Sequence, residues 1–209
     1  MRPRVLIADD HVLLLDAFER LLEGAYEIVG KAADGRELVR LALELRPDAV
    51  IADVSMPELN GLEAARQILG ALPRTRIVLL TVHEDEVLAA DAFRAGVAGF
   101  AVKRSAAAEL RQALQEVLAG RRFLTPLVAA GDARALAQRA GERPPVDRLT
   151  PREREVLQLL AEGRTMKEVG ARLGITARTV AFHKYQAGEK LGLRTTAELI
   201  RFALEHRLS

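Results

Sequence analysis

The first 120 residues alternate short apolar runs with stretches in which apolar residues recur at helical spacing. Three of the runs are continuously apolar, as in parallel strands that are buried on both faces. Five strand–helix units in succession predict an open, doubly wound parallel α/β sheet. The expected strands are residues 5–8, 26–30, 49–52, 77–80 and 99–102, and the expected helices lie near 11–23, 35–46, 61–71, 84–95 and 106–119.

Residues 121–148 break this alternation. The segment contains Arg121-Arg122, two isolated glycines and Pro144-Pro145, with alanine and arginine between them. Such a composition is typical of a linker, and a short helix is expected near 126–139. We therefore divide the chain into a domain of residues 1–120, a linker of 121–148 and a domain of 149–209.

Residues 149–209 predict four helices and no strand. Glycines mark the expected helix ends, and the helix after Gly174 is expected to begin at Thr176. A helix at 165–173, a turn at 174–175 and this next helix form a helix-turn-helix pattern, in which the second helix enters the major groove of DNA. Three helix starts carry capping boxes, at Thr150 with Glu153, Thr165 with Glu168 and Thr195 with Glu198.

Composition narrows the protein class. The chain of 209 residues has no cysteine, which excludes disulfides and thiolate chemistry and favours a reducing, cytoplasmic setting. We expect no membrane span, because no apolar stretch reaches the roughly 18 residues that a span requires. We also expect no signal peptide, because the first apolar run is short and ends at Asp9-Asp10.

The formal net charge of +2 hides an asymmetry along the chain. Residues 1–120 carry 14 basic against 19 acidic side chains, whereas residues 149–209 carry 11 against 7. An acidic first half and a basic second half suggest that only the second half meets a polyanion. Charge alone is equally compatible with two ordinary solvated surfaces.

Polar residues directly follow four of the expected strands. Asp9 and Asp10 come after the first strand, Asp53 after the third, Thr81 after the fourth and Lys103 after the fifth. In doubly wound sheets the ligand site lies outside the carboxyl ends of the strands. The spacing therefore brings three carboxylates, a hydroxyl and an ammonium group to one edge of the sheet.

These side chains have the chemistry of a phosphoryl-transfer site. Clustered carboxylates repel one another, and a hard cation such as Mg²⁺ relieves that repulsion through oxygen ligands. A carboxylate beside the cation can attack a phosphoryl group and form an aspartyl phosphate. Thr81 and Lys103 would then bind phosphoryl oxygens, because phosphoryl transfer depends mainly on positioning and charge neutralisation.

The ordered combination of these residues resembles the receiver domain of two-component response regulators. The resemblance covers about residues 3–120 and implies a flavodoxin-like fold with strand order 2-1-3-4-5. It also implies that Asp53 is the phospho-acceptor and that Mg²⁺ is the cofactor. The motifs are Asp9-Asp10, Asp53-Val54-Ser55-Met56-Pro57 with Asn60-Gly61, Thr81 and Lys103. The implied Mg²⁺ ligands are Asp10, Asp53 and the backbone carbonyl of Ser55, with Asp9 acting through water.

The same resemblance assigns the remaining positions of the site. Thr81 and Lys103 would bind the phosphoryl group, and Phe100 matches the switch aromatic that rotates when the threonine moves. Arg104 departs from the family, in which an acidic residue is common after the lysine. We expect this departure to have little effect on the acceptor chemistry.

Two alternatives use the same residues differently. Haloacid-dehalogenase-like phosphatases place a second aspartate two residues after the nucleophile, where this chain has Ser55. Their acid pair follows the lysine along the chain, whereas here Asp9-Asp10 comes before the other site residues. The second alternative is a DNA-binding regulator whose receiver signals without phosphate, through dimerisation or a ligand. The complete aspartate, threonine and lysine set favours a phosphorylation-switched regulator that catalyses only its own phosphoryl transfer and autodephosphorylation.

The second half closely resembles the NarL/FixJ (LuxR-type) DNA-binding domain over residues 149–209. The resemblance makes the helix from Thr176 the recognition helix. It implies double-stranded DNA, a cognate sensor histidine kinase and a second copy of the chain as partners. The matching residues are Leu149-Thr150-Pro151-Arg152-Glu153-Arg154-Glu155-Val156-Leu157, Gly163, Lys167-Glu168-Val169, Leu173-Gly174-Ile175, Thr179-Val180 and His183.

Candidate DNA contacts lie on the faces of the recognition helix away from its buried side. Basic side chains there would contact phosphates, which position a protein without reading sequence. Aromatic side chains could contact thymine methyl groups or a base edge. A single arginine or lysine is equally compatible with a solvated surface charge. The candidates are Arg178, Thr179, Ala181, Phe182, Lys184, Tyr185 and Arg194.

The recognition helix departs from the family at three positions. Ala181 stands where lysine is common, and Ala187-Gly188 stands where larger apolar residues are usual. Glycine inside a helix costs roughly 0.5–1 kcal/mol relative to alanine. We therefore expect the second half of this helix to be less stable than the first.

The resemblance also implies how the halves are coupled: phosphorylation releases the DNA-binding domain and favours dimers. The final helix, expected over 195–207, is the candidate dimer element. Its candidate apolar seam, some of which must be domain core, is Leu199, Phe202, Ala203 and Leu208.

Overall fold

A computed structural model describes residues 2–129, 145–206 and 208 of the chain. Contacts divide it into two compact units. The first unit comprises Met1–Met56 with Gly61–Glu142, and the second comprises Pro57–Asn60 with Arg143–Ser209.

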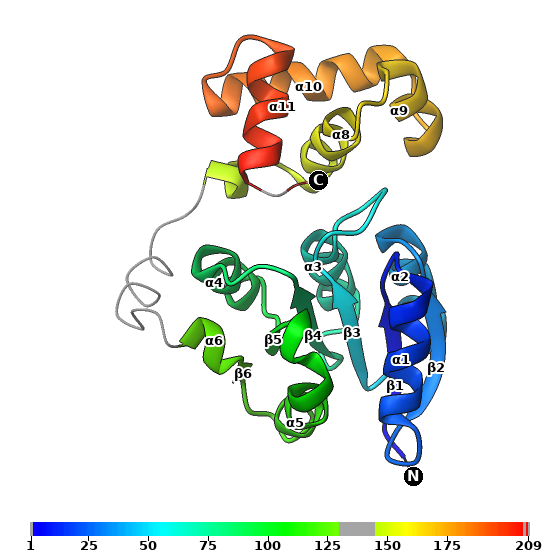
Figure 1. Ribbon diagram of the computed structural model, residues 1–209. Helices are drawn as coiled ribbons and strands as arrows, with labels where there is room; N and C mark the ends of the chain where they lie inside the picture. The colour runs from blue at the N-terminus through cyan, green and yellow to red at the C-terminus, as the bar shows by residue number, and fades with distance from the viewer. Residues whose placement is uncertain (1, 130–144, 207, 209) are drawn as a thin grey trace. The chain divides into compact units, whose positions relative to one another are not determined.

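The first unit is built on one parallel sheet with helices on both faces (Figure 1). The strand order is β2-β1-β3-β4-β5-β6, which confirms the predicted order and extends it by one strand. The strands are β1 (Arg4–Ala8), β2 (Glu27–Ala32), β3 (Ala49–Asp53), β4 (Arg76–Thr81), β5 (Gly99–Val102) and β6 (Phe123–Leu124). The α-helices are α1 (Val12–Leu22), α2 (Gly35–Leu45), α3 (Gly61–Ala71), α4 (Glu86–Arg94), α5 (Ala106–Leu118) and α6 (Pro126–Ala129).

Alternate residues of the central strands serve the two faces of the sheet. On one face, side chains such as Ile7, Ile51 and Leu80 form a core with buried residues of α1 and α5. The adjacent residues of these strands, such as Val50 and Leu79, point to the other face of the sheet and are equally buried. Strands that are buried on both faces explain the continuous apolar runs in the sequence.

The sequence analysis did not predict β6. Phe123 pairs with Gly99 and Leu124 with Phe100, so part of the expected linker joins the edge of the sheet. A two-residue strand has no periodicity of its own, and its pairing depends on the neighbouring β5. The expected helix near 126–139 is seen as α6 over Pro126–Ala129, and its remainder lies outside the described residues.

In its described residues after 144, the second unit contains helices and no strand, as predicted. The α-helices are α8 (Pro151–Ala161), α9 (Met166–Leu173), α10 (Ala177–Leu191) and α11 (Thr196–Glu205), preceded by a 3₁₀ turn at Pro145–Arg148. All three predicted capping boxes are present. The side chain of Thr176 caps α10, which confirms the predicted start of that helix.

Two apolar clusters form the core of these helices. The first includes Val156, Val169 and Val180 and joins α8, α9 and α10. The second includes Leu157 of α8 and Ala187 of α10 and joins them to α11. These clusters fix the orientation of α10 within the unit.

Gly170 allows the close approach between α9 and α10. A β-carbon at this position would lie 2.7 Å from the carbonyl oxygen of Ile175, which is closer than real β-carbons come. The amide of Ile175 donates to the Gly170 carbonyl at 2.9 Å. The tight turn of the helix-turn-helix therefore depends on this glycine.

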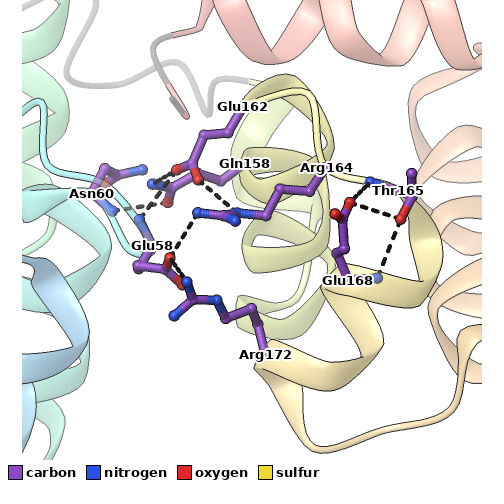
Figure 2. A network of polar contacts seen from close by, with 8 residues as sticks. All are labelled: Glu58, Asn60, Gln158, Glu162, Arg164, Thr165, Glu168 and Arg172. Atoms are coloured by element: carbon purple, nitrogen blue, oxygen red, sulfur yellow. Dashed lines mark hydrogen bonds and ion pairs between the residues drawn. The ribbon is translucent and has the colours of Figure 1, made fainter.

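Residues 57–60 belong to the second unit through a polar network (Figure 2). The Glu58 carboxylate lies 2.9 Å from a guanidinium nitrogen of Arg164 and 3.4 Å from one of Arg172. The amide of Asn60 donates to Gln158 Oε1 at 2.8 Å. The short segment is thus held by charge pairing at Glu58 and by hydrogen bonding at Asn60.

None of the helices in the described part of the chain has the length and apolar character that crossing a bilayer requires.

Candidate functional site

The carboxyl ends of β1, β3 and β5 bring three of the predicted polar residues into direct contact. Lys103 Nζ lies 2.7 Å from Asp9 Oδ2 and 2.9 Å from Asp53 Oδ2. Asp9 follows β1, Asp53 ends β3 and Lys103 follows β5. Parallel pairing of these strands places their ends at one edge, so the spacing in the sequence located this cluster.

Burial sets the electrostatics of the cluster. Asp9 is fully buried and Asp53 is 4% exposed. Burial raises the pKa of the Asp53 carboxyl, and the neighbouring Asp9 charge adds to this, while Lys103 and the Ser55 amide oppose it. For Lys103, burial lowers the pKa, but hydrogen bonds to Asp9 and Asp53 outweigh burial and raise it overall. The ammonium group therefore stays charged and stabilises both carboxylates.

Thr81 and Phe100 are both buried in the sheet. Thr81 is 2% exposed at the end of β4, and its hydroxyl accepts a hydrogen bond from the His83 amide at 3.2 Å. Phe100 is fully buried on β5, with its backbone opposite Leu79. The phenyl ring occupies an inward position in the described conformation.

The loop after β3 folds tightly onto the candidate acceptor strand. Ser55 is exposed, and its backbone amide bonds the Asp53 carboxylate. The assignment of its carbonyl as a Mg²⁺ ligand stays a prediction. The Gly61 amide donates to the Val54 carbonyl at 2.8 Å. A β-carbon on Gly61 would lie 2.0 Å from the Asp53 carbonyl oxygen, so only glycine fits.

His11 is a site residue that the sequence analysis missed. Its Nδ1 lies 2.8 Å from Asp10 Oδ1 and 3.2 Å from Asp9 Oδ1. The Asp10 charge, followed by hydrogen bonds that the imidazole donates to both carboxylates, raises the pKa of His11. Among the described contacts, Asp10 pairs with His11 and not with Lys103. The sequence signal that could have identified His11 is its position directly after Asp9-Asp10.

The charges and donor atoms fit a divalent cation. Asp9, Asp10 and Asp53 carry three negative charges, and Lys103 supplies one positive charge. Ligand atoms of Asp9, Asp10 and His11 lie within 4.8 Å of one another. Carboxylate oxygens are the ligands that Mg²⁺ prefers.

Arg104, the departure noted in the sequence, forms an ion pair with Glu84. The pair lies on the surface, with 62% of the Arg104 side chain exposed. Its charge is therefore directed to Glu84 and not to the buried carboxylates.

On α10 the predicted DNA contacts differ in accessibility. Phe182 is 57% exposed and Tyr185 is 60% exposed, which is unusual for large aromatic side chains. Arg178 of α10 and Arg194 of the loop after it are also exposed, whereas Ala181 is half-buried. The face that carries Phe182 and Tyr185 is therefore available to a partner.

Two other predicted contacts already have partners within the unit. The Thr179 hydroxyl lies 2.9 Å from that of Thr176, within the helix cap. Lys184 Nζ donates to the Thr196 hydroxyl at 3.0 Å. Lys184, Tyr185 and Arg194 line one hollow of about 350 Å³ between α10 and the start of α11.

The candidate dimer seam, formed by residues of α11 and by Leu208 after it, is mostly domain core. Leu199, Ala203 and Leu208 are buried in the second apolar cluster, and Phe202 packs against it. The buried side of α11 is therefore occupied by its own unit, whereas Leu204 is 55% exposed.

Comparison with protein families identifies both halves of the chain. Residues 5–115 match the response regulator receiver domain. Residues 147–203 match the bacterial regulatory proteins of the luxR family. The two matches follow the order of the α/β and helical regions.

Full-length relatives share this arrangement. The response regulator GacA of Pseudomonas aeruginosa is 34% identical over 206 residues, which cover 97% of this chain and 96% of the relative. The transcriptional regulatory protein MctR of Rhizobium johnstonii is 35% identical over 205 residues, covering 97% and 94%.

Solved structures of response regulators have a similar fold. A LuxR-family two-component response regulator from Aurantimonas sp. SI85-9A1 has a TM-score of 0.62 at 37% identity, over 66% of this chain and 99% of that one. The RcsB response regulator of Salmonella typhimurium has a TM-score of 0.60 at 27% identity, over 96% and 97%. RcsB in complex with DNA has a TM-score of 0.58 at 27% identity, over 97% and 98%.

The fold, the acidic site and these matches define a response regulator. The chain belongs to the two-component response regulators of the NarL/FixJ type, with a receiver domain and a LuxR-type helix-turn-helix DNA-binding domain. It is thus a transcription regulator and not an enzyme of the ordinary kind.

Proposed function

We propose that phosphorylation of Asp53 switches this regulator between weak and strong DNA binding. The observation that supports it most is the contact of Lys103 with both Asp9 and Asp53. We assign residues 1–120 to the receiver, 121–148 to the linker and 149–209 to the DNA-binding domain. The phosphoryl group would come from a cognate sensor histidine kinase in the cytoplasm, where the chromosome lies.

In this proposal Asp53 is the nucleophile. A carboxylate oxygen of Asp53 bonds to phosphorus as the bond to the donor breaks, and the leaving group keeps the electron pair. Lys103 would turn from Asp53 to the phosphoryl oxygens, and the Thr81 hydroxyl would donate a hydrogen bond to one of them. Buried cationic and hydroxyl groups of this kind stabilise charge without reorganisation of solvent. Hydrolysis of the aspartyl phosphate at the same residues resets the protein.

Mg²⁺ would neutralise the phosphoryl oxygens during transfer. Asp9, Asp10, Asp53 and the Ser55 carbonyl would hold it, and His11 would orient the first two carboxylates. Thr81 and Phe100 would carry the change onward, because Thr81 ends β4 beside the site and both residues are buried in the sheet. A phosphoryl group shifts an equilibrium only through contacts that differ between the two states.

The DNA contacts are proposed from the exposed surface of α10. Phe182 and Tyr185 would contact base edges and thymine methyl groups in the major groove. Arg178, Thr179, Lys184 and Arg194 would contact phosphates, with Ala181 facing the DNA at close range. We further propose that the active form is a homodimer, since two copies would read paired half-sites about one helical turn apart.

The acceptor assignment is tested by Asp53→Asn. We expect the parent protein with Mg²⁺ and a small phosphodonor to gain one phosphoryl group by intact-mass measurement. The variant should gain none, because an amide does not form the acyl phosphate. Asp16→Asn removes an exposed carboxylate of α1 and serves as the matched control, which should be phosphorylated like the parent. Equal phosphorylation of Asp53→Asn and the parent would disprove the assignment.

A further inference from the structure

A groove lies at the amino ends of the strands, at the edge of the sheet opposite Asp53. The segments before β3 and β4 and the last turn of α5 enclose about 810 Å³. Ligand pockets in proteins span about 300–1,000 Å³. The residues that line this groove are Arg46, Pro47, Asp48, Ala71, Leu72, Pro73, Arg74, Thr75, Arg76 and Leu118.

The groove is basic although the surrounding domain is acidic. Arg46, Arg74 and Arg76 are all exposed, and Asp48 is the single carboxylate in the lining. In the described part of the chain, none of these three guanidinium groups has an ion-pair partner. By contrast, Arg40 and Arg121 of the same unit pair with nearby glutamates. The three cations are therefore available to an anion from solution.

The carboxylate and the nearby helix end are already partnered. Asp48 Oδ2 accepts a hydrogen bond from the Arg4 amide at 2.8 Å. Arg4 Nη1 donates to the Leu45 carbonyl at 2.6 Å, at the carboxyl end of α2. Cations are favourable near the carboxyl ends of helices, and Arg4 fills that role here. The other three arginines are not required for it.

Hydrogen bonds hold the two loops of the groove in place. The Thr75 hydroxyl donates to the Pro47 carbonyl at 3.0 Å, and the Arg76 amide donates to the Asp48 carbonyl at 3.0 Å. A preformed site loses less conformational entropy when a ligand binds. Leu72, Pro73 and Leu118 add apolar surface beside the arginines.

We propose that this groove binds a small polyphosphate anion. The planar guanidinium group pairs with phosphate oxygens through two parallel hydrogen bonds, and three such groups suit a ligand with more than one phosphate. A nucleoside polyphosphate and an inorganic polyphosphate share this chemistry, and the apolar lining would add contacts only to the former. The site is independent of Asp53 and of the proposed switch.

The test uses the full-length protein without Mg²⁺, in excess chelator, so that the acidic site does not contribute. Calorimetric titration with ATP and with inorganic triphosphate should give saturable binding. R74Q/R76Q should weaken both by at least about tenfold, because each lost charge-assisted contact contributes strongly. The control R20Q/R40Q removes two exposed arginines from α1 and α2 and should change affinity less than about twofold.

Two further readouts make the outcome decisive. Hydrogen exchange of residues 72–76 should slow with ligand in the parent, and R74Q/R76Q should keep the circular dichroism spectrum of the parent, which verifies its fold. Tighter binding of ATP identifies a nucleotide, and equal binding identifies the phosphate chain alone; both support the site. The proposal is wrong if neither anion saturates the protein, or if R74Q/R76Q weakens binding no more than R20Q/R40Q does.

Discussion

At the scale of single residues, Gly188 explains the unusual sequence of the recognition helix. A β-carbon here would lie 2.7 Å from the Leu193 carbonyl oxygen, and the Leu193 amide donates to the Gly188 carbonyl at 2.9 Å. The loop after α10 thus packs directly on its helix. The predicted weakness of the second half of α10 remains a prediction, but the structure gives the glycine a packing reason.

We therefore predict that Gly188→Ala destabilises the second unit. Alanine favours helix by roughly 0.5–1 kcal/mol, but overpacking against backbone costs about 1–3 kcal/mol and should prevail. Urea unfolding followed by circular dichroism measures the difference. The control is Gly70→Ala in α3, where a β-carbon meets nothing within 4 Å, so the first unit should gain stability. A gain in both variants would contradict the packing argument.

The site residues that directly follow strands could be predicted from the sequence to lie close together. The apolar runs locate the strands, and three polar residues lie where these strands end: Asp9, Asp53 and Lys103. The contacts of Lys103 with both carboxylates could therefore be expected. The contact of His11 with Asp10 depends on the path of the turn after β1, which no periodicity encodes. The close fit of Gly61 against Asp53 likewise depends on backbone separation.

At the scale of elements, local capping signals predicted the helices of the second unit well. Each capping box couples a threonine to a glutamate three residues later, and both partners are encoded in the sequence. The strand β6 and the grouping of residues 57–60 were not predictable, because both depend on contacts between distant segments.

The capping box of α9 offers an element-scale prediction. Thr165→Ala removes the hydroxyl that accepts from the Glu168 amide at 3.3 Å and donates to the Glu168 carboxylate at 2.8 Å (Figure 2). Loss of such a cap should cost about 0.5–2 kcal/mol of unfolding free energy. Thr165→Ser keeps the hydroxyl and should retain most of the stability in the same urea titration. If serine and alanine are equally destabilising, the cap is not the cause.

At the scale of the whole molecule, charge and chemistry divide along the chain. Residues 1–120 are net acidic and hold the site that would accept phosphate, whereas residues 149–209 are net basic and hold the helix-turn-helix. A basic domain binds DNA through phosphates and loses affinity as salt rises. In the proposed switch, phosphorylation would therefore act on DNA binding through conformation or assembly, since it adds negative charge.

The most direct test measures binding to genomic DNA fragments at fixed salt with Mg²⁺, with and without beryllofluoride as a phosphoryl mimic. Solution mass is followed by light scattering. We expect the mimic to tighten sequence-selective binding by about 5–150-fold, the usual range of coupling between sites, and to produce dimers. Asp53→Asn should not respond. Equally strong selective binding without the mimic would contradict the proposed switch and leave a regulator whose receiver acts without phosphate.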